Sequence, residues 1–138
     1  MKVEIKKLEK HEDERGWLVE MLRGDQIDQE IKNIYFSISK PGAIRGNHYH
    51  KRKTEWFCTV KGKARLILGD NKSREKRELI LSGDDPTTIK IPPNVTHLIE
   101  NIGGDEMHLI VIVNEVFNPD DPDTLSRKVD VNKKDWGD

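Results

Sequence analysis

Short apolar runs with a period of two residues recur along the chain and are separated by Gly, Pro and Asp. The clearest are residues 33–39, 55–60, 64–68, 87–91 and 108–116, with shorter runs at 3–5, 17–22, 78–81 and 97–100. Such alternation is typical of strands with one buried face, and turn signals about every 8 to 12 residues indicate a β-sandwich or barrel. Residues 26–31 alone suggest a helical turn. The pattern therefore predicts an all-β fold.

Chain length and charge narrow the class of protein. The 138 residues correspond to about one domain. Charged residues make up 36% of the chain but the net charge is only −1, so the surface is charged with both signs. Nucleic-acid binding needs a basic surplus that displaces counterions from phosphates, and this composition disfavours it.

The chain has no apolar segment long enough for a membrane span, and its first residues, Met1 to Lys7, contain no apolar signal core. Its single cysteine, Cys58, cannot form an internal disulfide and alternates with Trp56 and Val60 on a predicted strand. We therefore expect a soluble cytoplasmic protein with Cys58 buried.

Residues 42–62 carry the most informative chemistry. His48 and His50 are two positions apart, so on an extended strand both imidazoles project from one face. Glu55 follows after a short turn, where a hairpin partner strand would return its carboxylate to the same place, and His97 comes much later. Imidazoles and a carboxylate suit a divalent transition metal. The predicted metal ligands are His48, His50, Glu55 and His97.

Two patterns, G-x5-H-x-H-x4-E-x6-G over residues 42–62 and P-x4-H-x3-N over residues 92–101, are the signatures of the cupin superfamily, which the chain resembles. The resemblance implies a cupin double-stranded β-helix, a jelly-roll barrel, as a single domain. We assign the barrel and its N-terminal strands to residues 1–124 and a charged tail to residues 125–138. One departure is Asn94 where cupins usually have Gly, and Asn tolerates the left-handed conformation of that turn.

Further segments narrow the family. Residues 13–20 and 37–49 are similar to segments of the dTDP-4-dehydrorhamnose 3,5-epimerases, D-x-R-G-x-aliphatic-x-E and S-x-S-x-x-G-x-x-R-G-x-H-Y. Over residues 13 to 124 the chain resembles more closely the C-terminal cupin domain of CapF-type capsular polysaccharide proteins, through R-G-N-H-Y-H and I-P-P-x-x-T-H-x-I-E-N. That resemblance implies a zinc-containing domain that epimerises C3 of a UDP-linked 4-keto-6-deoxy-N-acetylhexosamine. The fused reductase of that family is not part of this sequence, so a separate reductase is expected for the next step.

Epimerisation beside a ketone needs a base, an acid on the opposite face and positive charge near the keto oxygen. His48 is the base by resemblance to the 3,5-epimerases and a metal ligand by resemblance to metal cupins. One lone pair cannot serve both roles, and His50, where metal-free epimerases commonly have glutamine, favours ligation. If His48 is a ligand, the base comes from elsewhere, and the candidates are His108, Tyr49, Lys63, Tyr35 and Glu100.

The diphosphate of a nucleotide sugar suits a guanidinium that donates two parallel hydrogen bonds. Arg45, three residues before His48, is the first candidate, and the R-G-x-H arginine is a substrate-binding residue in the 3,5-epimerases that the chain resembles. Lys53 and Lys51 are further candidates. Arg15 either binds substrate across a subunit interface or pairs with Asp13 or Glu20.

Other functions fit the same residues. A sugar-nucleotide 3,4-ketoisomerase or a 3,5-epimerase uses the same proton chemistry, and three histidines with a glutamate also describe metal-dependent dioxygenases. A metal-stabilised binding module without activity is the non-enzymatic alternative. We expect a homodimer, because barrels of this kind pair their edge strands to cover them.

Overall fold

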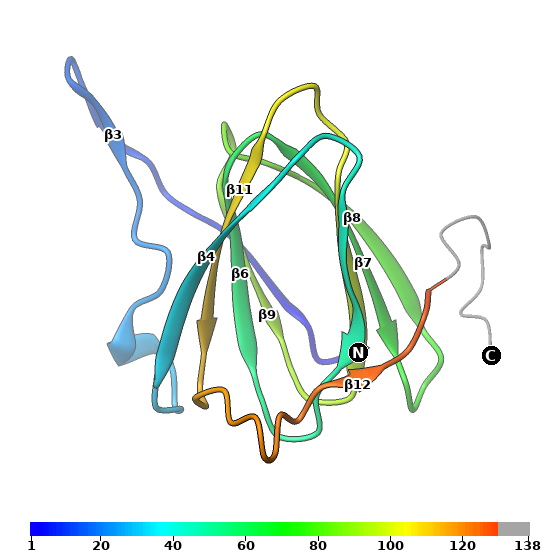
Figure 1. Ribbon diagram of the computed structural model, residues 1–138. Coiled ribbons are helices and arrows are strands. Elements are labelled where there is room, and N and C mark those ends of the chain that lie inside the picture. The colour runs from blue at the N-terminus through cyan, green and yellow to red at the C-terminus, as the bar shows by residue number, and fades with distance from the viewer. Residues whose placement is uncertain (130–138) are drawn as a thin grey trace.

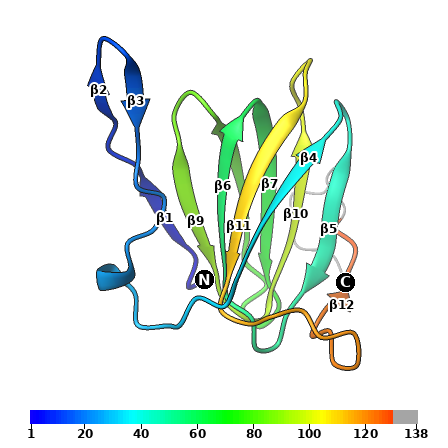
Figure 2. The same ribbon diagram turned by 60° about the vertical axis from the view of Figure 1, so that its left-hand side comes forward.

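Two five-stranded antiparallel sheets face each other and enclose the core, as Figures 1 and 2 show. The computed structural model describes residues 1–129. One sheet has the order β1-β9-β6-β11-β4 and the other β12-β5-β10-β7-β8. The strands are β1 (Glu4–Lys7), β2 (His11–Asp13), β3 (Gly16–Leu18), β4 (Asn33–Ser39), β5 (Ile44–Tyr49), β6 (Glu55–Lys61), β7 (Lys63–Asp70), β8 (Lys76–Ser82), β9 (Thr87–Ile91), β10 (Val95–Asn101), β11 (Met107–Val113) and β12 (Leu125–Ser126).

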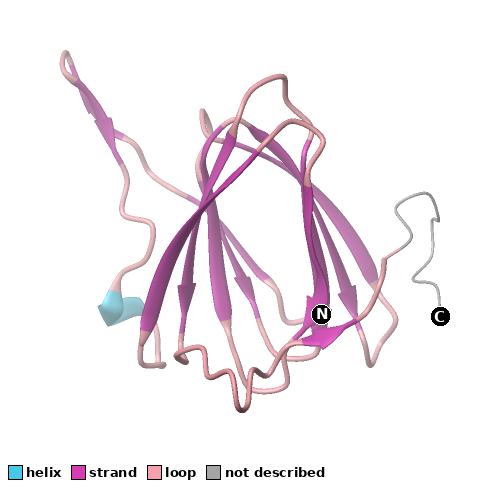
Figure 3. Ribbon diagram, viewed as in Figure 1, coloured by secondary structure: helices cyan, strands magenta, loops and turns pink. Residues whose placement is uncertain are grey.

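The described residues are almost entirely strand and loop, as Figure 3 shows, which confirms the predicted all-β jelly-roll fold. Within residues 1–129 the helical content is one 3₁₀ turn, η1 (Gly24–Gln26), and the chain is already extended at Ile27. The helical turn predicted at residues 26–31 was therefore misplaced, because so short a run forms few intrahelical hydrogen bonds.

Alternating residues of both sheets fill the space between them. Leu66 and Leu68 from β7 meet Ile89 from β9 and Val111 from β11, all fully buried. Removing these side chains from water is the main favourable contribution to folding. Because every second residue of each strand points inward, the polar side chains of β5, β6 and β10 that follow this period also enter the barrel.

The β2–β3 hairpin stands away from the barrel in both views (Figures 1 and 2). Its two strands pair only with each other, and Trp17 and Leu18 on it are 43% and 61% exposed. A lone two-stranded hairpin is marginally stable in water.

The packed chain continues beyond the boundary predicted at residue 124. Leu125 and Ser126 form β12 against β5, and Val129 packs with Ile67 and Leu98. The sequence of this segment is charged, but its backbone pairs with an edge strand and Val129 supplies an apolar anchor. The remainder of the predicted tail, residues 130–138, lies outside the described residues.

Asn94 and Cys58 behave as the sequence predicts. Asn94 adopts the left-handed conformation, with a φ of 65°. Cys58 on β6 is 1% exposed, and burial raises the pKa of its thiol. No helix in the described part of the chain is long and apolar enough to cross a bilayer.

Candidate functional site

A β-bulge in β5 sets the direction of two predicted site residues. His48 lies opposite His97, but Gly46 lies opposite Leu98, so Asn47 is an extra residue in the ladder. Gly46 and Asn47 both have positive φ, at 99° and 57°. An inserted residue reverses the alternation of side chains along a strand. Arg45 and His48, three positions apart, consequently face the same cavity.

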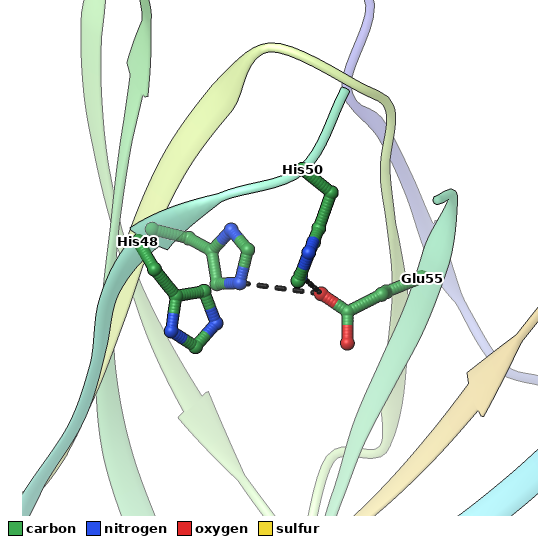
Figure 4. Close-up of side chains that lie close together, drawn as sticks. His48, His50 and Glu55 are labelled. Atoms are coloured by element: carbon green, nitrogen blue, oxygen red, sulfur yellow. Dashed lines mark hydrogen bonds and ion pairs between the residues drawn. The ribbon is translucent and has the colours of Figure 1, made fainter. Parts of the chain in front are cut away.

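The four predicted metal ligands converge inside the barrel. His48 comes from β5, His50 from the turn after it, Glu55 from β6 and His97 from β10, and their ligand atoms all lie within 4.8 Å of one another. Figure 4 shows His48, His50 and Glu55 pointing toward one another. His50 Nε2 is 2.8 Å from Glu55 Oε1, and His97 Nε2 is 3.3 Å from the same oxygen.

Backbone carbonyls orient two of the three imidazoles. His50 Nδ1 donates to the Asp123 carbonyl at 2.6 Å, and His97 Nδ1 donates to the Val95 carbonyl at 3.1 Å. Both rings therefore direct Nε2 toward Glu55. This is the usual arrangement of metal-bound histidine, whose second nitrogen donates to a carbonyl or carboxylate. The imidazole of His48 forms no hydrogen bond with the described residues.

A positively charged species at the centre of the cluster, a proton or a metal cation, would stabilise the arrangement of its lone pairs. His97 Nε2 is fully buried and has no hydrogen-bond partner within the described residues. With both Nδ1 atoms donating to carbonyls, neutral His50 and His97 would present only lone pairs to an ionised Glu55. A proton on His50 Nε2 removes one of these repulsions between lone pairs, and a divalent cation bound by the three groups would remove them all. The donor set of imidazole nitrogen and carboxylate oxygen fits zinc and related transition metals.

The electrostatics of the cluster follow from burial and proximity. Burial, reinforced by the neighbouring His97 and His50, lowers the pKa of His48 to about 4. Burial also opposes charge on His50, but the hydrogen bond and charge of Glu55 outweigh it and raise the pKa of His50. Burial alone would raise the pKa of Glu55, whereas His50 and His97 hold it well below the ordinary value. The imidazole of His48 is therefore neutral at pH 7.

Two cavities meet at the cluster, and His48 and Tyr35 line both of them. One cavity, of about 250 Å³, is lined by Tyr35, Ser37, Arg45, Gly46, His48, Phe57, His97, Ile99 and Leu109. The other, of about 270 Å³, is lined by Asn33, Tyr35, His48, His50, Lys53, Glu55, Val113, Glu115, Phe117 and Thr124. Tyr35 Oη donates to Glu55 Oε2 at 3.3 Å. Burial, followed by the charge of Glu55, raises the pKa of Tyr35, so its hydroxyl keeps its proton.

Arg45 reaches from β5 to the end of β4. Its Nε donates to Ser39 Oγ at 2.8 Å, and its Nη2 donates to the Ile38 carbonyl at 3.2 Å. These contacts use one N–H from each of two nitrogens, so the Nη1–Nη2 edge keeps a pair of parallel donors for an anion.

Lys53 lies in the second cavity wall and is buried rather than solvated. Its Nζ donates to the Pro122 carbonyl at 2.9 Å and lies 5.4 Å from the centre of the Phe117 ring. Lys51, the neighbouring candidate, is exposed and lines neither cavity.

The structure does not bring the other candidate bases to the cluster. By the alternation of side chains along their strands, His108 and Tyr49 belong to the outer faces of the sheets. There the His108 ring contacts Phe36, and Tyr49 lies opposite Leu125 in the ladder. Lys63 begins β7 beside inward-facing Ala64 and is exposed. Glu100 on β10 accepts hydrogen bonds from Arg65. Strand alternation is the reason in each case, because the adjacent residue is the inward one.

Arg15 lies in the hairpin turn and pairs with Asp13, which is one of the two roles predicted for it. It lines neither cavity of its own chain. If Arg15 contacts a substrate, that substrate would be bound in the cavities of a second subunit.

Asp123 is the site residue that sequence reasoning missed. Its carbonyl orients His50, and its carboxylate accepts hydrogen bonds from the backbone of the turn that follows His50. It lies outside both cupin patterns, at the end of the segment 1–124 that was assigned to the barrel. The run of Asp and Pro around it was the signal available.

The fold is the jelly-roll barrel of the cupins, and the cluster lies inside it. A sequence model of the polysaccharide biosynthesis C-terminal domain matches residues 11–125, and the chain belongs to that family. Two relatives of similar length support this assignment. The spore coat polysaccharide biosynthesis protein SpsL of Bacillus subtilis is 31% identical over 127 residues, covering 88% of this chain and 84% of SpsL. The probable low-salt glycan biosynthesis epimerase Agl13 of Haloferax volcanii is 30% identical, covering 88% and 83%.

Longer relatives match only in part. The UDP-2-acetamido-2,6-beta-L-arabino-hexul-4-ose reductase of Pseudomonas aeruginosa is 36% identical over 119 residues, which are 86% of this chain and 31% of that enzyme. The chain thus spans about a third of its length.

Among solved structures, the capsular polysaccharide assembling protein CapF of Staphylococcus aureus is 36% identical, with a TM-score of 0.69 over 88% of this chain and 34% of CapF. A 3,4-ketoisomerase from Helicobacter canadensis is 25% identical, with a TM-score of 0.77 over 91% of this chain and 90% of that one. The dTDP-6-deoxy-D-glucose-3,5-epimerase RmlC of Legionella pneumophila shares the fold, with a TM-score of 0.81 at 18% identity over 94% and 73%.

Proposed function

We propose that this protein is a sugar-nucleotide epimerase that inverts C3 of a UDP-linked 4-keto-6-deoxy-N-acetylhexosamine in the synthesis of a surface polysaccharide. One observation carries the proposal. His48 and Tyr35, from different sheets, form the wall shared by two cavities, beside a buried cluster of two further histidines and a glutamate. That arrangement supplies a neutral base, a hydroxyl donor and a place for positive charge, which are the three needs of epimerisation beside a ketone.

Two facts support the substrate class. The Pseudomonas relative is named for a UDP-linked 4-ketohexose, and Agl13 is named as a glycan biosynthesis epimerase. Arg45 lines the cavity next to His48 and presents its free guanidinium edge for the diphosphate. The sugar then extends from Arg45 toward His48.

The residues of the cluster divide the work. His50, Glu55 and His97 hold a divalent cation, best matched by zinc, and when bound that cation supplies positive charge near the keto oxygen. His48 lacks a hydrogen bond that would orient it as a fixed ligand and is neutral at pH 7, so it accepts the proton from C3. Tyr35 keeps its hydroxyl proton and lies across the same cavities, so it returns a proton to the other face.

A 3,4-ketoisomerase is the second candidate function. The similarity to a ketoisomerase of nearly the same length favours it, since 90% of that chain is covered. Both reactions begin with proton removal beside the ketone. They differ in the product, because the isomerase moves the carbonyl from C4 to C3 and the epimerase leaves it at C4.

We also propose that the protein forms a homodimer and supplies a separate reductase with its product. β4 is an edge strand whose outward side chains Ile34, Phe36 and Ile38 are 63%, 54% and 42% exposed. A row of apolar side chains on a sheet edge marks an interaction surface. A reductase is expected because the relative from Pseudomonas carries that activity in its name, on a chain about three times the length matched here.

The direct test is incubation of the zinc-loaded protein with a UDP-linked 4-keto-6-deoxy-N-acetylhexosamine in deuterium oxide. Incorporation of deuterium at C3 with the ketone retained at C4 supports the epimerase. A ketone at C3 indicates the isomerase, and exchange at both C3 and C5 indicates a 3,5-epimerase.

A further inference from the structure

The carboxylate of Asp123 is buried in a nest of backbone N–H groups. Oδ1 accepts from the Lys51 N–H at 2.9 Å, and Oδ2 accepts from the N–H groups of Arg52 and Lys53 at 2.9 and 3.0 Å. The Asp123 side chain is 2% exposed. Three charge-assisted hydrogen bonds fix the turn between His50 and Glu55 relative to the C-terminal strap, by which we mean residues 119–129.

The same residue acts on His50 through its backbone. The Asp123 carbonyl accepts the Nδ1 proton of His50 at 2.6 Å. A carbonyl cannot donate, so this contact requires the proton on Nδ1 and leaves Nε2 directed at Glu55, 2.8 Å away. Asp123 has a φ of 49°, a left-handed conformation that places side chain and carbonyl as observed and that Asp and Asn tolerate better than other residues.

The strap is attached on the other side of His48 as well. The carbonyl of Asn47 accepts from the Arg127 N–H at 2.9 Å, and Asn47 Oδ1 accepts from the Val129 N–H at 3.0 Å. Ser126 pairs with His48 in the ladder between β12 and β5. The strap therefore forms hydrogen bonds with the chain on both sides of the segment from His48 to His50.

We propose that Asp123 is a positioning residue for His50: its carboxylate holds the turn after His50, and its carbonyl keeps the imidazole proton on Nδ1, so that Nε2 is presented to the cation site. The C-terminal strap is then a working part of the site. The part of this proposal that concerns the His50 proton is independent of catalysis, and the part that concerns metal affinity depends on the proposed function.

The test compares Asp123→Asn with two controls in the full chain. Asp123→Asn keeps the size and the left-handed preference but turns an amide N–H₂ toward backbone N–H groups. Asp120→Asn removes an exposed charge from the same strap. Arg52→Gln removes ion pairs to Glu115 and Asp121 and a longer one, of 4.0 Å, to the Asp123 carboxylate, and it keeps the Arg52 backbone N–H for Asp123.

Two readouts are needed. Long-range ¹H–¹⁵N NMR of the imidazoles is expected to show a slowly exchanging proton on His50 Nδ1 in the wild type and both controls, in contrast to exposed His11. In Asp123→Asn this proton is expected to exchange as fast as that of His11. Zinc titration is expected to show an affinity about 10- to 100-fold weaker for Asp123→Asn and unchanged for the controls.

A wild-type His50 without a protected Nδ1 proton would overturn the proposal whatever the variants do, so it can be judged even if Asp123→Asn fails to fold. An Arg52→Gln effect equal to that of Asp123→Asn would also overturn it, because the side-chain ion pairs of Arg52, and not the backbone hydrogen bonds of Asp123, would then hold the turn. If the Nδ1 proton is protected in the wild type and exposed in Asp123→Asn, the positioning role is supported. If the wild type at the same time binds no zinc, the cation site of the proposed function is contradicted and the positioning role still stands.

Discussion

Gly46 of β5 lies against the carbonyl oxygen of His97 on β10, so that a Cβ atom at Gly46 would be 2.6 Å from that oxygen. The approach brings the backbones of the two histidine-bearing strands together at the bulge. It exists only because Gly has no side chain and tolerates a φ of 99°.

Substituting Gly46 by Ala is therefore expected to separate β5 from β10 and to weaken both the fold and the site. Gly42→Ala is the matched control, since Gly42 also has a positive φ, of 81°, but its added methyl meets nothing within 4 Å. Both variants are destabilised by the left-handed conformation, and only Gly46→Ala is destabilised further by the clash. Urea denaturation should show Gly46→Ala to be less stable than Gly42→Ala by about 1–3 kcal/mol. Equal stabilities would show that the strands do not approach as described.

Exchange of His48 and His50 by Gln separates their proposed roles. His50→Gln should weaken zinc binding strongly, because His50 is held between Asp123 and Glu55. His48→Gln should abolish deuterium exchange at C3 and retain most of the zinc affinity, because His48 has no such support among the described residues. Calorimetric zinc titration and product NMR measure the two effects. A loss of zinc in His48→Gln as large as in His50→Gln would make His48 a ligand.

The titration of His48 provides a pH test in the metal-free protein. Burial, with His97 and His50 nearby, lowers its pKa from 6.5 to about 4. Between these values the unfolded chain binds more protons at this site than the folded chain, so His48 makes stability fall as pH drops from 6.5 toward 4. NMR should place the His48 midpoint near pH 4, and His48→Gln should lose less stability on acidification than the wild type. A midpoint near 6.5 would contradict the described environment.

Arg45→Lys tests the diphosphate site. Lysine keeps the charge but loses the paired donors and the hydrogen bond to Ser39 Oγ. We expect kcat/KM to fall about 10- to 100-fold, the size of one or two charge-assisted hydrogen bonds. Arg77→Lys, on β8 and outside both cavities, is the control and should leave kcat/KM unchanged. A free UDP competitor should lose affinity for Arg45→Lys in parallel. Unchanged UDP binding would remove Arg45 from the site.

A charged residue on the apolar face of β4 tests the dimer. Phe36 is 54% exposed between Ile34 and Ile38, so Phe36→Glu should convert the dimer to a monomer in light-scattering measurements. Ile80→Glu changes a side chain of similar exposure, 56%, on the other sheet and should leave the dimer intact. A wild-type monomer at micromolar concentration would contradict the proposal.

The strands and three of the four converging side chains could be predicted because they depend on short-range regularities, whereas His97 on β10 was assigned through the second cupin pattern. Alternation marks the inward positions of β6, β7 and β11, and the spacing of His48, His50 and Glu55 reflects one turn between two strands. The common face of Arg45 and His48 does not follow from such a rule. In a regular strand these residues would point to opposite faces, and only the bulge at Asn47 aligns them.

Asp123 was missed for a different reason. It acts across 70 to 73 residues of sequence, through its carbonyl on His50 and through its carboxylate on the backbone N–H groups of the turn at 51–53. The donors that its carboxylate meets are backbone N–H groups, which are the same for every residue type, so no partner side chain in the turn points to Asp123. His108 was the opposite case, in which a residue type suited to catalysis lies on the outer face, next to Phe36.

The measurement closest to the central claim is proton exchange on the substrate. Zinc-loaded protein and a UDP-linked 4-keto-6-deoxy-N-acetylhexosamine in deuterium oxide should give deuterium at C3, in wild-type protein and not in His48→Gln, with the ketone still at C4. Absence of exchange at C3 with the folded, zinc-loaded wild type would contradict the account.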